Sequence, residues 1–116
     1  MNVITVHGRL TREPEIKDYE SKKGKGKMAT FTVASDRRFG DDPDFFDCAL
    51  FGDKRADVFG THFHKGQEIV LMGELNSRTV ESDGVKRKYW TINVDQFDFC
   101  GSKQDGMQQI EDDAPF

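Results

Sequence analysis

The chain has 116 residues and a net charge of −4, and 33% of its residues are charged. This length suits one domain with a hydrophobic core, and no apolar run approaches the roughly 20 residues that a membrane helix needs. The N-terminus lacks the charged and then apolar layout of a signal peptide, so we expect a cytoplasmic protein with no membrane partner. Cys48 and Cys100 lie far apart and favour packed, reduced thiols over a disulfide or a metal site.

The charge is unevenly distributed along the chain. Residues 1–103 contain all seventeen Lys and Arg and seventeen of the twenty-one Asp and Glu, so this part is neutral. The remaining four acids lie in the last thirteen residues. An acidic end displaces its charge from the rest of the surface, so the net charge does not exclude nucleic acid as a partner.

The first part of the chain predicts a strand and a lysine-rich turn. Residues 3–10 read as a strand, which residues 11–20 extend past Pro14, a residue tolerated at a sheet edge or a bulge. Residues 21–27, SKKGKGK, contain four lysines. This segment could contact phosphates, or it could be an exposed hairpin tip.

A half-buried strand follows over residues 28–35, in which Phe31 and Val33 point inward and threonines point outward. The strand ends in a loop that begins with Arg37, Arg38 and Phe39. Two guanidinium groups beside an aromatic ring suit the backbone and the bases of a nucleic acid. Phe39 could instead anchor the loop in the core.

The most informative segment is residues 44–52, DFFDCALFG, which alternates with the period of two of a β-strand. The face suited to a core consists of Phe46, Cys48 and Leu50. The opposite face carries Phe45 and Phe51, which a soluble protein has reason to expose if flat groups stack on them. The alternative is a strand buried on both faces, as in a sandwich.

A short helix is predicted next. Asp53 is a plausible N-cap, and Ala56, Phe59 and Phe63 follow at helical spacing, which indicates a face packed on the core. The three histidines of the chain show no spacing typical of a zinc or hydrolytic site. We therefore expect them to be solvated or packed.

Two long strands complete the domain. Residues 66–80 form a strand in which Gly73 marks a bulge or a sharp bend. Asp83 and Gly84 predict a hairpin turn, and residues 85–99 return as the last strand. Five strands, with one short helix between the third and fourth, predict an all-β fold: a five-stranded Greek-key barrel of the OB type.

Six segments match one family in order and spacing: HGRLTREPEI, FTVASDRRF, DFFDCALFG, KRADVFGTHFHKG, IVLMGELNSR and DDAPF. The chain resembles the bacterial single-stranded DNA-binding proteins, including phage-encoded forms, over residues 2–99 and its last six residues. The resemblance implies an OB-fold that wraps single-stranded DNA without sequence preference, usually as a homotetramer. It also implies a cytoplasmic, nucleoid-associated protein, or one in the host cytoplasm if the gene belongs to a phage.

The resemblance also assigns site residues. By position, the rings on which bases stack are Phe39, Phe45 and Phe51. A fourth family aromatic aligns with Val80, so we assign this stacking role to Trp90; Tyr89 could also supply it or could belong to the barrel wall. The residues themselves, and not the resemblance, supply the candidate phosphate contacts, because single-stranded DNA offers a charged backbone. They are Arg9, Arg12, Arg37, Arg38, Lys54, Arg78, Lys86 and Arg87, and for each the alternative is a surface ion pair.

The end of the chain predicts a separate role. Residues 1–100 form the predicted OB-fold domain, and residues 101–110 are too poor in apolar side chains to pack, so we expect a disordered linker. The tip over residues 111–116 consists of Glu111, Asp112, Asp113, Ala114, Pro115 and Phe116. Its carboxylates and terminal ring suit a pocket with an apolar floor and a basic rim, or simply a solubilising end. The resemblance implies that the tip recruits replication, recombination and repair proteins.

Two other hypotheses stay open. The first is an OB-fold interaction protein of a replication-restart or RNA-binding kind. The second is a nuclease in which Asp41, Asp42 and Asp44 bind a metal, but these residues lie beside Pro43 in a turn without a matched base, which favours solvated loop charges. We therefore expect no enzymatic activity, no cofactor and no metal.

Overall fold

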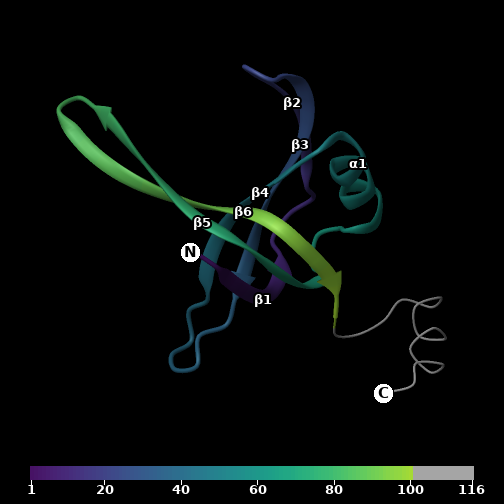
Figure 1. The fold of residues 1–116 in the computed structure, drawn as a ribbon. Helices are drawn as coiled ribbons and strands as arrows, with labels where there is room; N and C mark the ends of the chain where they lie inside the picture. Colours follow the sequence, from purple (N-terminus) through teal and green to yellow (C-terminus); the bar gives the residue numbers. More distant parts are fainter. Residues whose placement is uncertain (101–116) are drawn as a thin grey trace.

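The computed structural model describes residues 1–100, and the predicted linker (101–110) and tip (111–116) lie outside the described residues. The elements are β1 (Ile4–Leu10), β2 (Glu15–Ser21), β3 (Gly24–Ser35), β4 (Asp44–Phe51), α1 (Asp53–His62), β5 (Glu68–Ser82) and β6 (Val85–Phe99) (Figure 1). The strands form one sheet in the order β1-β5-β6-β4-β3-β2, which closes where β1 also pairs with β3. The predicted OB-type barrel, with its helix after the strand 44–51, is confirmed.

The sheet contains one strand more than predicted. Residues after Leu10, which we expected to extend the first strand, leave it before Pro14 and form β2. Proline has no N–H to donate to a strand ladder, so the chain changes direction here at little cost. Because β2 pairs with β3 from Glu15↔Thr30 to Ser21↔Gly24, the lysine-rich segment 21–27 contains the exposed tip of a hairpin.

Aromatic side chains from the sheet and the helix fill the barrel. Phe31 stacks on Phe59 with ring centroids 4.3 Å apart, and Phe59 stacks on Phe63 at 4.6 Å. Phe63, the residue after α1, then stacks on Phe99 at 4.3 Å. The rest of the core is aliphatic or small: Val6, Leu10, Ala29, Val33, Cys48, Leu50, Ala56, Ile69, Leu71, Ile92 and Val94. The helix therefore closes one end of the barrel with the apolar face predicted for it.

The N-terminus of α1 differs from the prediction. Gly52, not Asp53, is the N-cap, and its φ of 124° lies in the region that glycine adopts readily. Asp53 is the first helical residue, and its Oδ1 accepts a hydrogen bond of 2.7 Å from the backbone N–H of Lys27. The Asp53 carboxylate thus fastens the helix to β3 instead of capping it.

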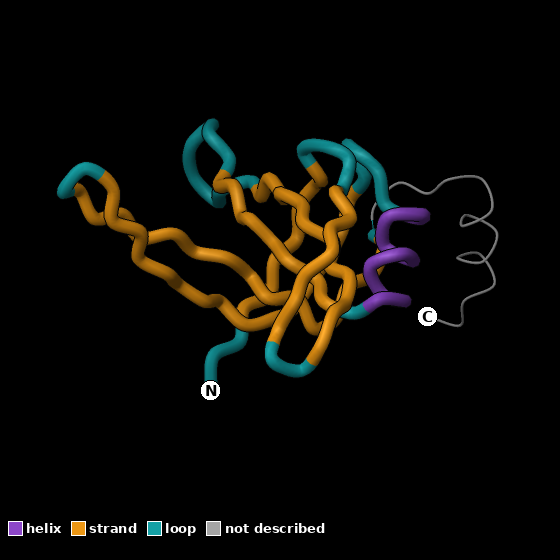
Figure 2. The backbone as a smooth tube through the Cα atoms, turned by 90° about the horizontal axis from the view of Figure 1, so that it is seen from above, coloured by secondary structure: helices purple, strands orange, loops and turns teal. Residues whose placement is uncertain are grey.

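The predicted irregularity at Gly73 is confirmed. The β5–β6 register shifts between Met72 and Gly73. A Cβ atom on Gly73 would lie 2.2 Å from the carbonyl oxygen of Asn93, so the two backbones approach too closely for a side chain. Beyond this point β5 and β6 continue as an arm, which leaves the barrel on the side away from α1 (Figure 2). The predicted Asp83-Gly84 turn ends the arm.

Within residues 1–100 the structure contains one helix, α1, and it is short. Within this range, no helix combines the length and the apolar character that crossing a bilayer requires.

Candidate nucleic-acid interface

One face of β4 carries two rings that are open to solvent, with the buried Ala49 between them. Phe45 is 66% exposed and Phe51 is 38% exposed, whereas Cys48 and Leu50 are buried and Phe46 packs against the core. The predicted alternation of this strand is therefore confirmed, and the alternative of a strand buried on both faces is wrong.

The surface between these two rings is made of small and polar side chains. Across β3, Ala34 lies opposite Phe45 and Met28 opposite Phe51, with two threonines between them. Thr32 donates a hydrogen bond of 3.1 Å to Oδ1 of Asp47, which holds this carboxylate against the sheet. The rings consequently border a low floor that a flat group can approach.

Phe51 is supported from a strand that the sequence did not predict. Tyr19, on β2, packs edge-on against the Phe51 ring with centroids 5.1 Å apart and planes at 88°. Gly26 lies opposite Tyr19 and leaves space for its ring, because a Cβ there would be 2.9 Å from the tyrosine hydroxyl. Sequence reasoning missed Tyr19, and the break at Pro14 is the signal that could have separated its strand from β1.

The loop between β3 and β4 exposes the third predicted ring. Phe39 is 85% exposed, which excludes the alternative in which it anchors the loop in the core. The Arg38 guanidinium lies 6.0 Å from the centre of this ring. Arg37 instead donates from Nε and Nη2 to Oδ1 of Asp44, at 3.0 and 2.8 Å, and this contact raises the pKa of Arg37. Asp44, the first residue of β4, thus forms an ion pair with Arg37 of the preceding loop.

The arm presents two further exposed rings, each beside a cation. The Arg78 guanidinium lies 5.7 Å from the Tyr89 ring, and the Lys88 ammonium lies 5.7 Å from the Trp90 ring. Tyr89 and Trp90 are neighbours in β6 and therefore point to opposite faces. Tyr89 is exposed and does not belong to the barrel wall, and Val80 is exposed as well. Lys88 was not among the predicted residues, although its two-residue spacing from Trp90 is a signal for it.

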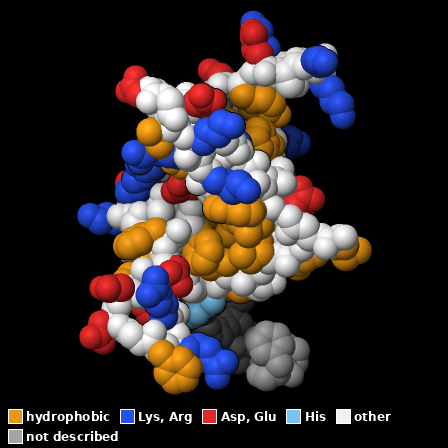
Figure 3. Space-filling model, turned by 90° about the vertical axis from the view of Figure 1, so that its left-hand side faces the viewer, with side chains coloured by type: hydrophobic (Ala, Val, Ile, Leu, Met, Phe, Trp, Pro, Cys, Tyr) orange, Lys and Arg blue, Asp and Glu red, His pale blue; other side chains and the backbone are white. Residues whose placement is uncertain are grey.

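Trp90 and Phe45 border the same hollow. The hollow has a volume of about 320 Å³ and is lined by Trp90 together with Phe45, Phe46 and Leu75. Because Cys48 of β4 lies opposite Ile92 of β6, Trp90 lies on the Phe46 side of the sheet and Tyr89 on the Phe45 side. Figure 3 shows one face of the molecule on which hydrophobic side chains gather in patches with Lys and Arg side chains beside them.

The predicted phosphate contacts fall into three groups. Ion pairs hold Arg9 against Glu68 at 2.7 Å, Arg12 against Glu15 at 3.8 Å, and Arg37 against Asp44. Arg38 and Arg78 instead make cation–π contacts, Arg38 with the Phe39 ring and Arg78 with the Tyr89 ring. The third group consists of exposed side chains: Lys54 on α1, and Lys86 and Arg87 on the arm.

The predicted tip residues, from Asp112 to Phe116, lie outside the described part of the chain.

Comparisons with known proteins show the family to which this chain belongs. The sequence profile of the Single-strand binding protein family matches residues 1–100. The chain belongs to this family. The single-stranded DNA-binding protein of Fusobacterium nucleatum is 36% identical over 110 residues, which cover 89% of this chain and 69% of the relative. Single-stranded DNA-binding protein 1 of Nostoc sp. is 38% identical over 118 residues, which cover 99% and 96% of the two chains.

A solved structure shares the fold of this family member. It is the Plasmodium falciparum SSB in complex with single-stranded DNA, with a TM-score of 0.73 and 21% sequence identity. The superposition covers 87% of this chain and 96% of that chain. Single-strand binding proteins are binding proteins and not enzymes, in agreement with the expectation of no catalytic activity.

Proposed function

We propose that this chain binds single-stranded DNA without sequence preference and protects it. Bases stack on Phe39, Phe45, Phe51 and Trp90, and the neighbouring Arg and Lys side chains contact the phosphates. The observation that carries the proposal is the pair of rings left open on β4, above a floor of small side chains. The names of the relatives and the DNA held by the Plasmodium protein support the same conclusion.

The physical argument rests on what single-stranded DNA offers. Its bases expose their π-faces, and stacking on an aromatic side chain contributes about 1–3 kcal/mol per base whatever the base is. Its backbone carries one negative charge per phosphate, which Lys and Arg neutralise with release of counterions. Arg12 and Arg37 can exchange their carboxylate partners for phosphates at small cost, because exposed ion pairs contribute about 0–1 kcal/mol.

The test is a titration of the protein with oligo(dT) at several salt concentrations. We expect the logarithm of the affinity to fall linearly with the logarithm of the salt concentration, with a slope of about −0.7 per phosphate contacted. Oligo(dC) should bind similarly, and duplex DNA of equal length much more weakly. Equal affinity for the duplex would contradict the proposal. Tighter binding to oligo(rU) than to oligo(dT) would favour the RNA-binding alternative, and cleavage of DNA with Mg²⁺ would favour the nuclease.

We also propose that the chain acts as a homotetramer in the cytoplasm, as the resemblance implies. Several subunits that share one strand multiply the stacking contacts, so four copies bind one strand far more tightly than one copy does. Residues 1–100 are the DNA-binding part of each copy under this proposal, and residues 101–110 are the linker to the tip.

The last six residues are proposed to recruit proteins of replication, recombination and repair. Asp112 and Asp113 stand beside Phe116, whose preceding Pro115 restricts the backbone. Such a segment suits a partner with an apolar pocket and a basic rim. Removing residues 111–116 should leave oligo(dT) affinity within about twofold, because the proposed stacking rings remain. It should abolish binding to such a partner in a pull-down from cell extract, and retained capture of the same partners would contradict the proposal.

A further inference from the structure

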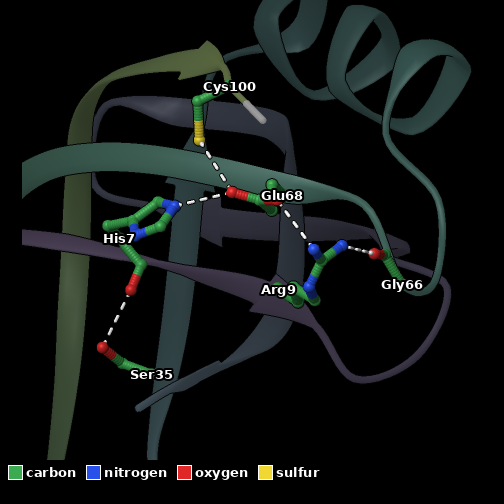
Figure 4. Close-up of polar contacts among 6 residues, drawn as sticks. All are labelled: His7, Arg9, Ser35, Gly66, Glu68 and Cys100. Carbon is green, nitrogen blue, oxygen red and sulfur yellow. Dashed lines mark hydrogen bonds and ion pairs between the residues drawn. The ribbon is translucent and has the colours of Figure 1, made fainter. Parts of the chain in front are cut away.

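Figure 4 shows a second cluster of side chains, which lies where β1, β5 and the end of β6 meet. Its side chains are His7 on β1, Glu68 at the start of β5, and Cys100 directly after β6. Nε2 of His7 is 2.8 Å from Oε2 of Glu68, and Sγ of Cys100 is 3.8 Å from the same oxygen. All three potential ligand atoms lie within 4.8 Å of one another.

The sheet brings these residues together. The strands β1, β5 and β6 are neighbours, so the central strand contributes Glu68 and the flanking strands contribute the other two. Arg9 pairs with Glu68, and Ile69 pairs with Phe99, so His7 and Cys100 lie on either side of Glu68. Strand pairing therefore positions His7 and Glu68, and Cys100 directly follows the last paired residue of β6. Side chains on paired strands are a precise platform for a site.

We propose that His7, Glu68 and Cys100 bind a Zn²⁺ ion, with water in the fourth position. Imidazole nitrogen, carboxylate oxygen and thiolate sulfur are the three ligand types of zinc, at bond lengths of about 2.0–2.3 Å. In a tetrahedral site such bonds separate the ligand atoms by about 3.5 Å. The separations of 2.8 and 3.8 Å lie on either side of this value, and the His7 and Cys100 ligand atoms lie within 4.8 Å of each other, so side-chain rotations are enough to form the site. Mg²⁺ and Ca²⁺ are not suited, because they require oxygen ligands.

Arg9 holds the Glu68 carboxylate in position. Its Nη2 donates to Oε1 of Glu68 at 2.7 Å, and its Nη1 donates to the carbonyl oxygen of Gly66 at 2.9 Å. This contact leaves Oε2 directed at His7 and Cys100, as a ligating carboxylate requires.

The charges of the loaded site balance. Cys100 loses its thiol proton to solvent and binds as a thiolate, and His7 binds through Nε2 as the neutral tautomer with its proton on Nδ1. The thiolate and the Glu68 carboxylate together neutralise the two positive charges of Zn²⁺. The Arg9 guanidinium therefore does not face a net positive site.

Zinc at this position joins three strands. It ties β1 and β5 to the residue that follows β6, from which residues 101–116 continue. A ligand that binds the native state alone also stabilises it against unfolding.

The expectation of no metal site came from the sequence spacing, which does not relate His7 to a cysteine 93 positions later.

The test uses Co²⁺ as a spectroscopic substitute for Zn²⁺ on the full 116-residue chain. We expect a thiolate-to-cobalt charge-transfer absorption that saturates at one Co²⁺ per chain and is abolished by added Zn²⁺. Cys100→Ser should remove this absorption, and His7→Ala should weaken Co²⁺ binding at least about tenfold, because each removes a ligand. A chain without the absorption, or a Cys100→Ser variant that keeps it, would overturn the proposal.

Two matched controls and one measurement without substitutions complete the test. Cys48→Ala should keep the absorption, because Cys48 is 2% exposed and burial raises the pKa of its thiol to about 12. His64→Ala should also keep it, because the His64–Glu13 pair has no third ligand close enough within residues 1–100. In the unaltered protein, Zn²⁺ should slow alkylation of Cys100 at least about tenfold, as measured by peptide mass spectrometry. An unchanged alkylation rate would overturn the site.

Discussion

We expect Phe45→Ala and Phe51→Ala each to weaken oligo(dT) binding at least about tenfold while the fold stays intact, because stacking contributes about 1–3 kcal/mol per base. Tenfold corresponds to about 1.4 kcal/mol, which lies within this range. Phe45 is the more exposed ring, and Tyr19 holds the Phe51 ring edge-on. Fluorescence anisotropy of labelled oligo(dT) at fixed salt measures the effect.

The control for this experiment is another exposed apolar side chain. Val58 is half exposed on α1 and is not one of the proposed stacking rings, so Val58→Ala should leave the affinity unchanged. Phe45→Trp should bind at least as tightly as the natural chain, because the larger indole offers more surface for stacking. Unchanged affinity in both alanine variants, with normal thermal unfolding, would contradict the stacking proposal.

Gly73→Ala is expected to lower the free energy of unfolding by about 3 kcal/mol or more, because overpacking of this kind costs about 1–3 kcal/mol and occasionally more. The added Cβ would lie 2.2 Å from the carbonyl oxygen of Asn93, and both groups belong to paired backbone. The strands must separate at the bend to accept the methyl group. For a domain of this size the midpoint of thermal unfolding should fall by roughly 12–24 °C.

Gly60→Ala is the matched control for this substitution. Its Cβ would lie 3.0 Å from Cδ1 of Ile16, the end of a flexible side chain that can move aside. Alanine also stabilises a helix by about 1 kcal/mol relative to glycine, which offsets the shift. We expect a stability within about 1 kcal/mol of the natural chain. Equal unfolding temperatures for Gly73→Ala and Gly60→Ala would show that the close approach at Gly73 carries little energy.

The sequence by itself determined the features that depend on near neighbours. The two-residue period of residues 44–51 assigned one face of β4 to the core and the other to solvent. Gly73 and the Asp83-Gly84 turn located the bend and the hairpin of the last two strands. These signals are local, because side-chain alternation and turn conformation are set by a few adjacent residues.

Only the tertiary structure decided which distant residues meet. Pairing of β2 with β3 placed Tyr19 against Phe51, and the helix position directed the Asp53 carboxylate to Lys27 instead of to a cap. The neighbouring order β1-β5-β6 brought His7 and Cys100 to opposite sides of Glu68. These contacts follow from how the sheet closes, and no spacing along the chain encodes them, because closure joins strands through hydrogen bonds between backbones that are identical in every residue but proline.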